Sequence, residues 1–186
     1  AHPWKIAQED AVTSSFYDRD RVRKRLTDER GRIEKEAPFT VALAYPSPYG
    51  AAMSSLGYQR IYRAIMEAPG LACERAFLDD EAERDISAQK RPHTYESLKP
   101  LEAFPVVAVS VAYELEIAGL VQLLNAAGIP PRRRDRNGSH PFILAGGPLT
   151  FSNPLPLAGF VDAIVGGGGL VMVPALFAAF PGAPPA

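Results

Sequence analysis

The feature that most constrains the fold is the regular alternation of short apolar runs with segments of helical periodicity. The apolar runs are rich in Val, Ile, Leu, Ala and Phe, as expected of strands that are buried on both faces of a sheet. Their sequences are FTVALAY, ACERAFL, VVAVSV, PFILAGG and VDAIV. Strands that alternate with helices predict a parallel sheet that is covered on both faces and joined by right-handed crossovers.

We therefore predict an α/β fold, a flavodoxin-like (Rossmann-like) doubly wound parallel sheet with five strands in the order 2-1-3-4-5. Residues 1–37 are expected to form a charged helical arm or connector, residues 38–180 the α/β domain, and residues 181–186 a tail rich in Pro and Gly. The arm contains DRDRVRKRLTDERGRIEKE, which mixes both charge signs. This mixture favours a solvated helix over an arm that binds nucleic acid.

Helix signals follow the first, third and fifth runs. Ser54 or Ser55 could cap the first helix, which Pro69-Gly70 would end, and Gly128 would stop the second. A final helix is expected near residues 171–179. The side chains expected to point inward are Tyr58, Ile61, Tyr62, Ile65 and Met66 in the first helix, and Leu120, Val121, Leu123 and Leu124 in the second.

The predicted strand order reverses between strands one and three, and a ligand crevice is expected at this topological switch point. The loop expected at Pro46–Met53 would face the loop at Ser110–Glu114. Two prolines fix φ in the first loop, so a ligand would meet a preformed surface there. The residues expected to flank the ligand are Pro46, Ser47, Pro48 and Tyr49 on one side, and Ser110 and Tyr113 on the other. Ser110 is the best polar candidate, and Tyr113 the best candidate to lie against a ring.

Two glycine clusters close the fourth and fifth runs, Gly146-Gly147 before Pro148 and Gly166–Gly169. Glycine at the carboxyl end of a parallel strand lets a bulky group approach the backbone. Either cluster alone is typical of a tight turn, but two clusters at the carboxyl edge of the sheet favour a ligand site. The glycines expected to admit the tail of a long ligand are Gly146, Gly147, Gly166 and Gly168.

No pattern for a catalytic or metal site stands out elsewhere. His2, His93 and His140 have no partners at metal-ligand spacing, and Cys73 lies within a strand, where a buried thiol is expected. The acids at 79–81 could bind a hard cation or a ribose, although a solvated loop is favoured. The arginines at 132–136 read as an exposed turn that could attract phosphate or an acidic partner.

Charge and cysteine content limit the partners and the compartment. The net charge of −1 gives no overall attraction to nucleic acid or a membrane surface. No apolar run reaches the roughly 18 residues of a membrane span. A single cysteine fits a reducing compartment, so a cytoplasmic location is expected.

Three blocks carry a resemblance to a known family. They are Tyr-Pro-x-x-Tyr…Met-Ser-x-Leu-Gly from Tyr45, Ser-x-x-Tyr-Glu from Ser110, and Gly-Gly-Pro from Gly146. With their surroundings, roughly residues 26–170, they resemble the N-terminal domain of radical S-adenosylmethionine (SAM) proteins, which looks like a cobalamin-binding, flavodoxin-like module. The family tends to place Gly-acid-Gly-Glu after its fifth strand, whereas this chain has Gly166–Gly169 and then Leu170.

The resemblance implies a cofactor-binding module that has no catalysis of its own. Cobalamin is the implied ligand, without the histidine that serves many corrinoid modules as lower ligand of cobalt, because the loop at Pro46–Gly50 contains none. A [4Fe–4S] cluster needs three cysteines, so the cluster and SAM are expected only in a C-terminal radical SAM barrel that is absent from this chain and is its expected partner. The alternative is a docking domain that contacts this barrel, or another partner, and holds no cofactor.

Overall fold

The computed structural model describes residues 19–80 and 90–166. Its centre is a five-stranded sheet in the order β2-β1-β3-β4-β5, in which every neighbouring pair is parallel. This confirms the predicted flavodoxin-like, doubly wound α/β fold. The strands are β1 (Phe39–Pro48), β2 (Leu71–Leu78), β3 (Val106–Ser110), β4 (Phe142–Gly146) and β5 (Ala163–Ile164).

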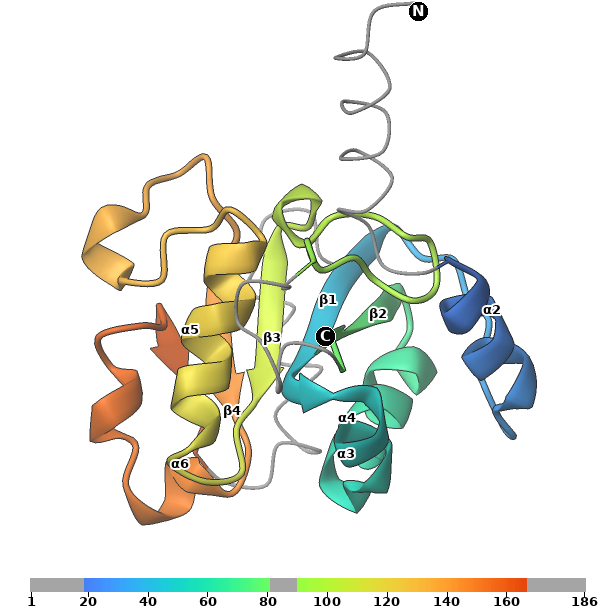
Figure 1. Cartoon of the computed structure of the whole chain (residues 1–186), viewed down its shortest axis with the longest axis horizontal. Helices are drawn as coiled ribbons and strands as arrows, with labels where there is room; N and C mark the ends of the chain where they lie inside the picture. Colours follow the sequence, from blue (N-terminus) through green and yellow to red (C-terminus); the bar gives the residue numbers. More distant parts are fainter. Residues whose placement is uncertain (1–18, 81–89, 167–186) are drawn as a thin grey trace, which may run out of the picture.

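Helices cover both faces of the sheet, and Figure 1 shows α5 on one side of it and the α3–α4 pair on the other. The α-helices are α2 (Arg19–Asp28), α3 (Tyr49–Ser54), α4 (Leu56–Glu67), α5 (Glu116–Ala126) and α6 (Leu149–Ser152). Single 3-10 turns are η2 (Leu101–Ala103), η3 (Arg133–Asp135) and η4 (Leu155–Leu157). The helix expected near residues 171–179 lies outside the described residues.

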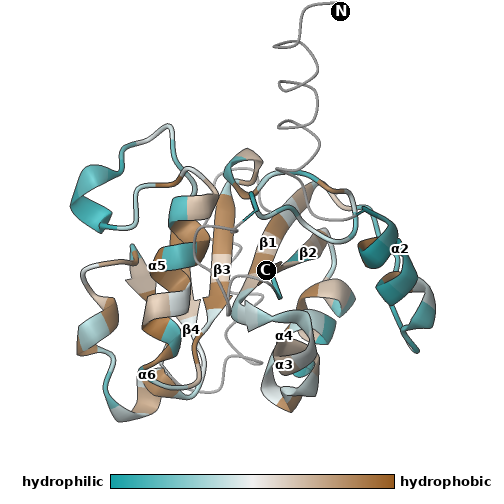
Figure 2. Cartoon of the chain, in the orientation of Figure 1, coloured by the Kyte–Doolittle hydropathy of each residue, from teal (hydrophilic) through white to brown (hydrophobic). Residues whose placement is uncertain are grey.

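Two apolar cores lie on the two faces of the sheet because side chains alternate along each strand. On β1, Leu43 and its i±2 neighbours belong to the core that contains Tyr58 of α4. Ala42 and Ala44 belong to the second core, with Leu120 of α5. Figure 2 shows the strands as the most hydrophobic elements and α2 as the most hydrophilic helix. Burial of each large aliphatic side chain in such a core contributes about 1.5–3 kcal/mol.

The small side chains of β1 let α5 pack very close to the sheet. A Cβ atom added to Gly119 of α5 would lie 2.1 Å from the carbonyl oxygen of Pro46. No side chain fits in that space, so glycine is required where the helix crosses the end of β1. This contact fixes the position of α5 relative to the strand end that the sequence assigned to a ligand site.

The predicted helix signals are confirmed. Ser55 caps α4, because its Oγ accepts a hydrogen bond from the N–H of Tyr58 at 3.3 Å. Gly70 and Gly128 follow α4 and α5 with φ of 70° and 72°. The buried side chains are Tyr58, Tyr62, Ile65 and Met66 in α4 and Leu120, Leu123 and Leu124 in α5, while Ile61 and Val121 are half-buried.

The first strand is longer than expected. It was expected to end before its two prolines, whereas β1 includes Pro46 and ends at Pro48. Its pairing with β3 stops at Ala44, and its register with β2 shifts between Tyr45 and Pro48. Proline lacks an N–H donor, and a bulged strand end that is paired on one side tolerates it. The expected stiff loop is therefore an extended strand end that leads directly into α3 at Tyr49.

The charged helix α2 is not solvated on all sides, contrary to expectation. Val22 is buried, and the guanidinium of Arg25 lies 2.5 Å from a carboxylate oxygen of Asp80. Arg21 lies 3.4 Å from Asp80 and 3.8 Å from the buried Asp79. Asp79 and Asp80 therefore lie against α2 rather than in the solvated loop that was favoured, and Glu81 lies outside the described residues.

Candidate functional site

The carboxyl ends of the strands form one edge of the molecule. We call the last residues of β1, β3 and β4, together with the segments that follow these strands, the carboxyl rim, which comprises residues 46–56, 110–116 and 146–155. In Figure 1, α3, the start of α5 and α6 lie together at this edge. Because β1 pairs with β3 up to Ala44 and Val109, Pro46 and Ser110 lie at the carboxyl ends of adjacent strands. The strand order reverses between β1 and β3, so the topological switch point of the sheet lies here.

On the β1 side of the rim, Tyr49 packs against other residues of the protein. Its ring stacks on Tyr95 at 5.4 Å between centroids and meets the edge of Phe77 at 5.4 Å. The guanidinium of Arg25 lies 4.5 Å from the ring centroid, and the hydroxyl donates to Glu29 at 2.8 Å. Burial, followed by the Glu29 carboxylate, raises the pKa of Tyr49.

The other three residues expected on this side form the strand end itself. Pro46 is buried beneath Gly119, and Ser47 and Pro48 are half-buried. Tyr49 and Pro46 thus have defined structural roles. A role of these four residues in holding a ligand stays a prediction.

On the β3 side, Ser110 and Tyr113 are accessible. Ser110 is half-buried and pairs with Gly146 in the β3–β4 register. Within the described part of the chain, its hydroxyl makes no hydrogen bond. Tyr113 is 49% exposed. These two residues therefore offer a hydroxyl and a half-exposed ring on one segment of the rim.

The glycines that the sequence assigned to a ligand site differ in the space around them. At Gly146 and Gly166 the nearest atom to an added Cβ would lie 4.0 Å away, so both positions leave room. Gly147 has φ of 107°, and its Cβ would lie 2.5 Å from the carbonyl oxygen of Val111. Gly147 is therefore required by the close approach of two backbone segments, as in a tight turn. Gly168 lies outside the described residues.

A tyrosine–glutamate pair beside the rim, Tyr45 and Glu116, was not predicted from the sequence. Glu116 begins α5, is 3% exposed, and accepts a hydrogen bond from the N–H of Ala112 at 2.5 Å. Burial, and then the charge of Glu116, raise the pKa of Tyr45 to about 12. Helical periodicity alone assigns a polar residue to solvent, but an acid in the first helical turn signals a contact with free backbone N–H groups.

Large exposed apolar side chains gather on the carboxyl rim. Within residues 19–80 and 90–166, every large hydrophobic side chain classed as exposed belongs to it. The side chains and their exposed fractions are Leu115 80%, Leu155 78%, Leu56 75%, Phe151 66% and Tyr113 49%. Scattered single apolar residues are common on protein surfaces, whereas a set confined to one edge indicates an interaction site.

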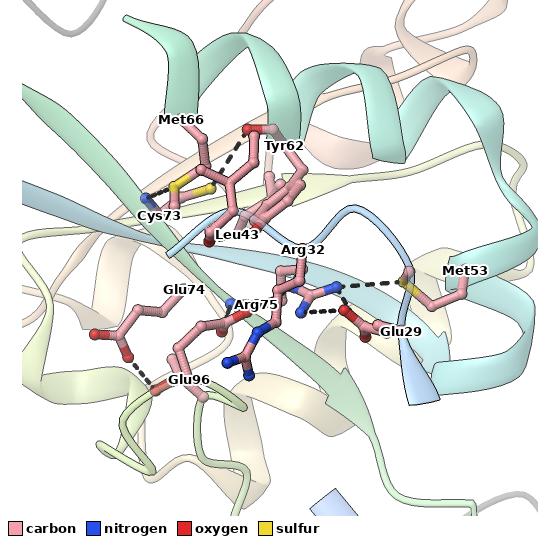
Figure 3. A network of polar contacts seen from close by, with 12 residues as sticks. Glu29, Arg32, Leu43, Met53, Tyr62, Met66, Cys73, Glu74, Arg75 and Glu96 are labelled. Atoms are coloured by element: carbon pink, nitrogen blue, oxygen red, sulfur yellow. Dashed lines mark hydrogen bonds and ion pairs between the residues drawn. The ribbon is translucent and has the colours of Figure 1, made fainter. Parts of the chain in front are cut away.

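A buried charged cluster lies on the face of the sheet that α4 covers (Figure 3). Arg75 of β2 forms a bidentate pair with Glu29 at 2.8 and 3.0 Å, and its Nε donates to Glu96 at 2.7 Å. Its guanidinium also lies 4.7 Å from the ring centroid of Tyr62. Burial raises the pKa of Glu96, although Arg75 opposes this effect. Arg75 thus links β2 to Glu29, which precedes β1, and to Glu96, which follows β2.

The same region covers the free edge of β2. The N–H of Tyr95 donates to the carbonyl of Arg75 at 2.8 Å, and the N–H of Arg75 donates to the Glu96 carboxylate at 2.6 Å. Thr94 donates to Glu74 at 2.5 Å, and Ser97 donates to the same carboxylate. These bonds replace the missing neighbour of an edge strand, so the cluster has a structural role.

The residues present do not fit an iron–sulfur cluster. Cys73 is the sole cysteine of the sequence; it is buried in β2, where burial raises the pKa of its thiol. A [4Fe–4S] cluster is held by several thiolates. Among the described residues, no group of three His, Cys, Asp or Glu side chains could hold a metal ion.

In the same part of the chain, no helix has both the length and the apolar character needed to cross a bilayer.

The sequence is similar to a known family of proteins. Residues 57–183, more than half of the chain, match a family model described as "Radical SAM proteins, N-terminal". A search of curated proteins found no match.

Proposed function

The chain belongs to the family of radical SAM protein N-terminal domains, and from this premise we propose that it is a docking module whose carboxyl rim packs against the radical SAM domain of its parent protein. The single observation that carries the proposal is that, in the described part of the chain, the large exposed apolar side chains are confined to this rim. The chemistry of such a parent protein depends on a [4Fe–4S] cluster and SAM, which the single buried cysteine of this chain cannot support.

The composition of the rim fits a protein partner. Leu115 and Leu155 are each more than three-quarters exposed, so burial beneath a partner would remove much apolar surface from water. Full burial of one such side chain contributes about 1.5–3 kcal/mol. Phe151 and Tyr113 add aromatic side chains, which are enriched at the centres of interfaces. The half-buried Ser110 provides a hydroxyl among these apolar groups.

Hydrogen exchange tests this proposal by comparing the chain alone with the complete parent protein. We expect amides of residues 111–116 and 149–155 to exchange more slowly in the parent. Leu115→Ser and Phe151→Ser should restore faster exchange there and leave the chain alone unchanged, because both side chains are exposed in it. Ala103→Ser is the matched control, since Ala103 is exposed and precedes β3 at the opposite edge. Equal exchange of the rim in both proteins would contradict docking.

Corrinoid binding is the second candidate, and Ser110 and Tyr113 favour it. In the described part of the chain, the Ser110 hydroxyl makes no hydrogen bond, and about half of Tyr113 is open to solvent. Gly146 and Gly166 leave room on the next two strands for the tail of a long ligand. The packing of Pro46 and Tyr49 into the protein interior argues against contact with the β1 side. For this reason we place docking first.

Visible spectroscopy distinguishes the two candidates. The chain is incubated with hydroxocobalamin and desalted, and its spectrum is recorded. Corrinoid bands that persist in the wild type and weaken in Ser110→Ala and Tyr113→Ala would support binding at the rim. A colourless protein after desalting would reject this candidate.

A further inference from the structure

A hollow lined by arginines lies at the amino edge of the sheet, opposite the carboxyl rim. It is formed where the segment that precedes β4 meets the segment that precedes β5, and its volume is about 580 Å³. This volume falls within the range of sites for small molecules, roughly 300–1,000 Å³. The lining residues are Arg132, Arg133, Arg134 and Arg136 from the first segment, and Ala158, Gly159 and Phe160 from the second.

The hollow carries positive charge that its own acids only partly balance. Arg132 is exposed and makes no ion pair within the described ranges 19–80 and 90–166. The Nε atoms of Arg133 and Arg134 lie 3.7 Å from carboxylate oxygens of Asp162 and Asp135, respectively. These distances exceed the normal range of hydrogen bonds, so the guanidinium donors stay available to a ligand. In Figure 2 the segment around η3 is hydrophilic and projects from the body of the domain.

Arg136 holds the arginine segment in place. Its side chain is 3% exposed; it donates to the carbonyls of Pro130 and Pro131 at 3.1 and 3.0 Å and to Asp162 at 3.1 Å. The Asp162 carboxylate also accepts from the N–H of Ile143 at 2.8 Å, at the start of β4. The backbone that carries the exposed arginines is therefore held in place before any ligand binds, which lowers the entropic cost of ordering this segment, while the side chains of Arg133 and Arg134 extend into solvent.

The two segments meet directly, and the second lines the hollow with Ala158, Gly159 and Phe160. The N–H of Arg133 donates to the carbonyl of Gly159 at 3.0 Å. No atom lies within 4 Å of the position of a Cβ at Gly159, so the space above this residue is open. Phe160 is half-buried beside it and packs against the second apolar core, so only part of its ring borders the hollow. A ligand in the hollow thus meets guanidinium groups and an aromatic ring side by side.

From this juxtaposition we propose that the hollow binds a nucleotide, with its phosphates on Arg132, Arg133 and Arg134 and its base against Phe160. Arginine pairs with phosphate oxygens through two parallel N–H donors, which gives both strength and orientation. An aromatic side chain stacks on a base whatever the identity of the base. The site is at the other edge of the sheet from the carboxyl rim, so this inference does not depend on docking or corrinoid binding.

Calorimetric titration at low salt tests the site, with ADP, inorganic pyrophosphate and adenosine as probes. We expect ADP to bind most tightly and adenosine most weakly. Arg132→Ala and Arg134→Ala should each weaken ADP about tenfold or more, as expected for the loss of a hydrogen bond to a charged group. Arg23→Ala, which removes an exposed arginine from α2, is the matched control and should leave binding unchanged. Phe160→Leu should weaken ADP but not pyrophosphate, and retained pyrophosphate binding shows that this variant is folded.

Three results would overturn the proposal. The first is the absence of any ADP binding to the wild-type chain. The second is an equal loss of ADP affinity in Arg23→Ala and in the Arg132 and Arg134 variants, which would indicate non-specific charge attraction. The third is tight binding of a single-stranded oligonucleotide by a chain that does not bind ADP, which would assign the surface to nucleic acid.

Discussion

Replacement of Arg75 by methionine removes the cation from the buried cluster and leaves its two carboxylates in place. The side chain of Arg75 is 2% exposed, and those of Glu29 and Glu96 are 8% and 18% exposed. The variant loses the bidentate pair with Glu29 and the Nε bond to Glu96. Removal of one partner from a buried ion pair lowers the free energy of unfolding by about 3–5 kcal/mol, because a charge stays buried without compensation. A domain of ordinary stability has only about 5–15 kcal/mol in total.

Urea unfolding, followed by circular dichroism at neutral pH, measures this loss. Arg60→Met is the matched control, since Arg60 is exposed on α4 and its replacement should change the free energy of unfolding by about 0.5 kcal/mol or less. The triple variant Arg75→Met, Glu29→Gln, Glu96→Gln should regain more than half of the loss, because neutral amides do not need a cation. A loss below about 1 kcal/mol in Arg75→Met, or a triple variant no more stable than the single one, would refute the assigned role of the cluster.

Three further predictions concern packing, capping and pH. Gly119→Ala should lower the free energy of unfolding by about 1–3 kcal/mol, because the added Cβ would lie 2.1 Å from a backbone oxygen. Gly50→Ala is the control and should not destabilise the protein, because its added Cβ has no neighbouring side chain or backbone segment within 4 Å. Thermal unfolding compares the two variants. Ser55→Ala should lose about 1 kcal/mol with the N-cap of α4 in urea unfolding, and an unchanged midpoint would contradict the cap. Burial lowers the pKa of His93 below 6.5, so the unfolded chain binds a proton first as the pH falls. Stability should therefore decrease as the pH drops from 7 through 6.5, and this part of the pH dependence should disappear in His93→Asn.

The sequence by itself determined the sheet and the helices α4 and α5 that cover it, whereas α3 lies where a loop was expected. Each of these elements has a local signal: apolar runs for strands buried on both faces, a 3.6-residue period for helices, Ser55 for a cap, and Gly70 for a stop. The order of the strands followed because an alternation of strands and helices leaves few allowed topologies. The same reasoning placed Pro46 and Ser110 beside each other at the carboxyl ends of adjacent strands.

Tertiary structure alone decided which polar residues leave the solvent. Arg75 is paired with Glu29 across 46 residues and with Glu96 across 21, and Arg25 reaches Asp80 across 55. Such pairs leave no period and no spacing in the sequence, because the fold brings together elements that are distant along the chain. Tyr49 likewise faces Tyr95 and Phe77 only because α2, β2 and the segment after β2 converge there. Local patterns fix the backbone elements, whereas the partners of a buried charge depend on the packing of those elements.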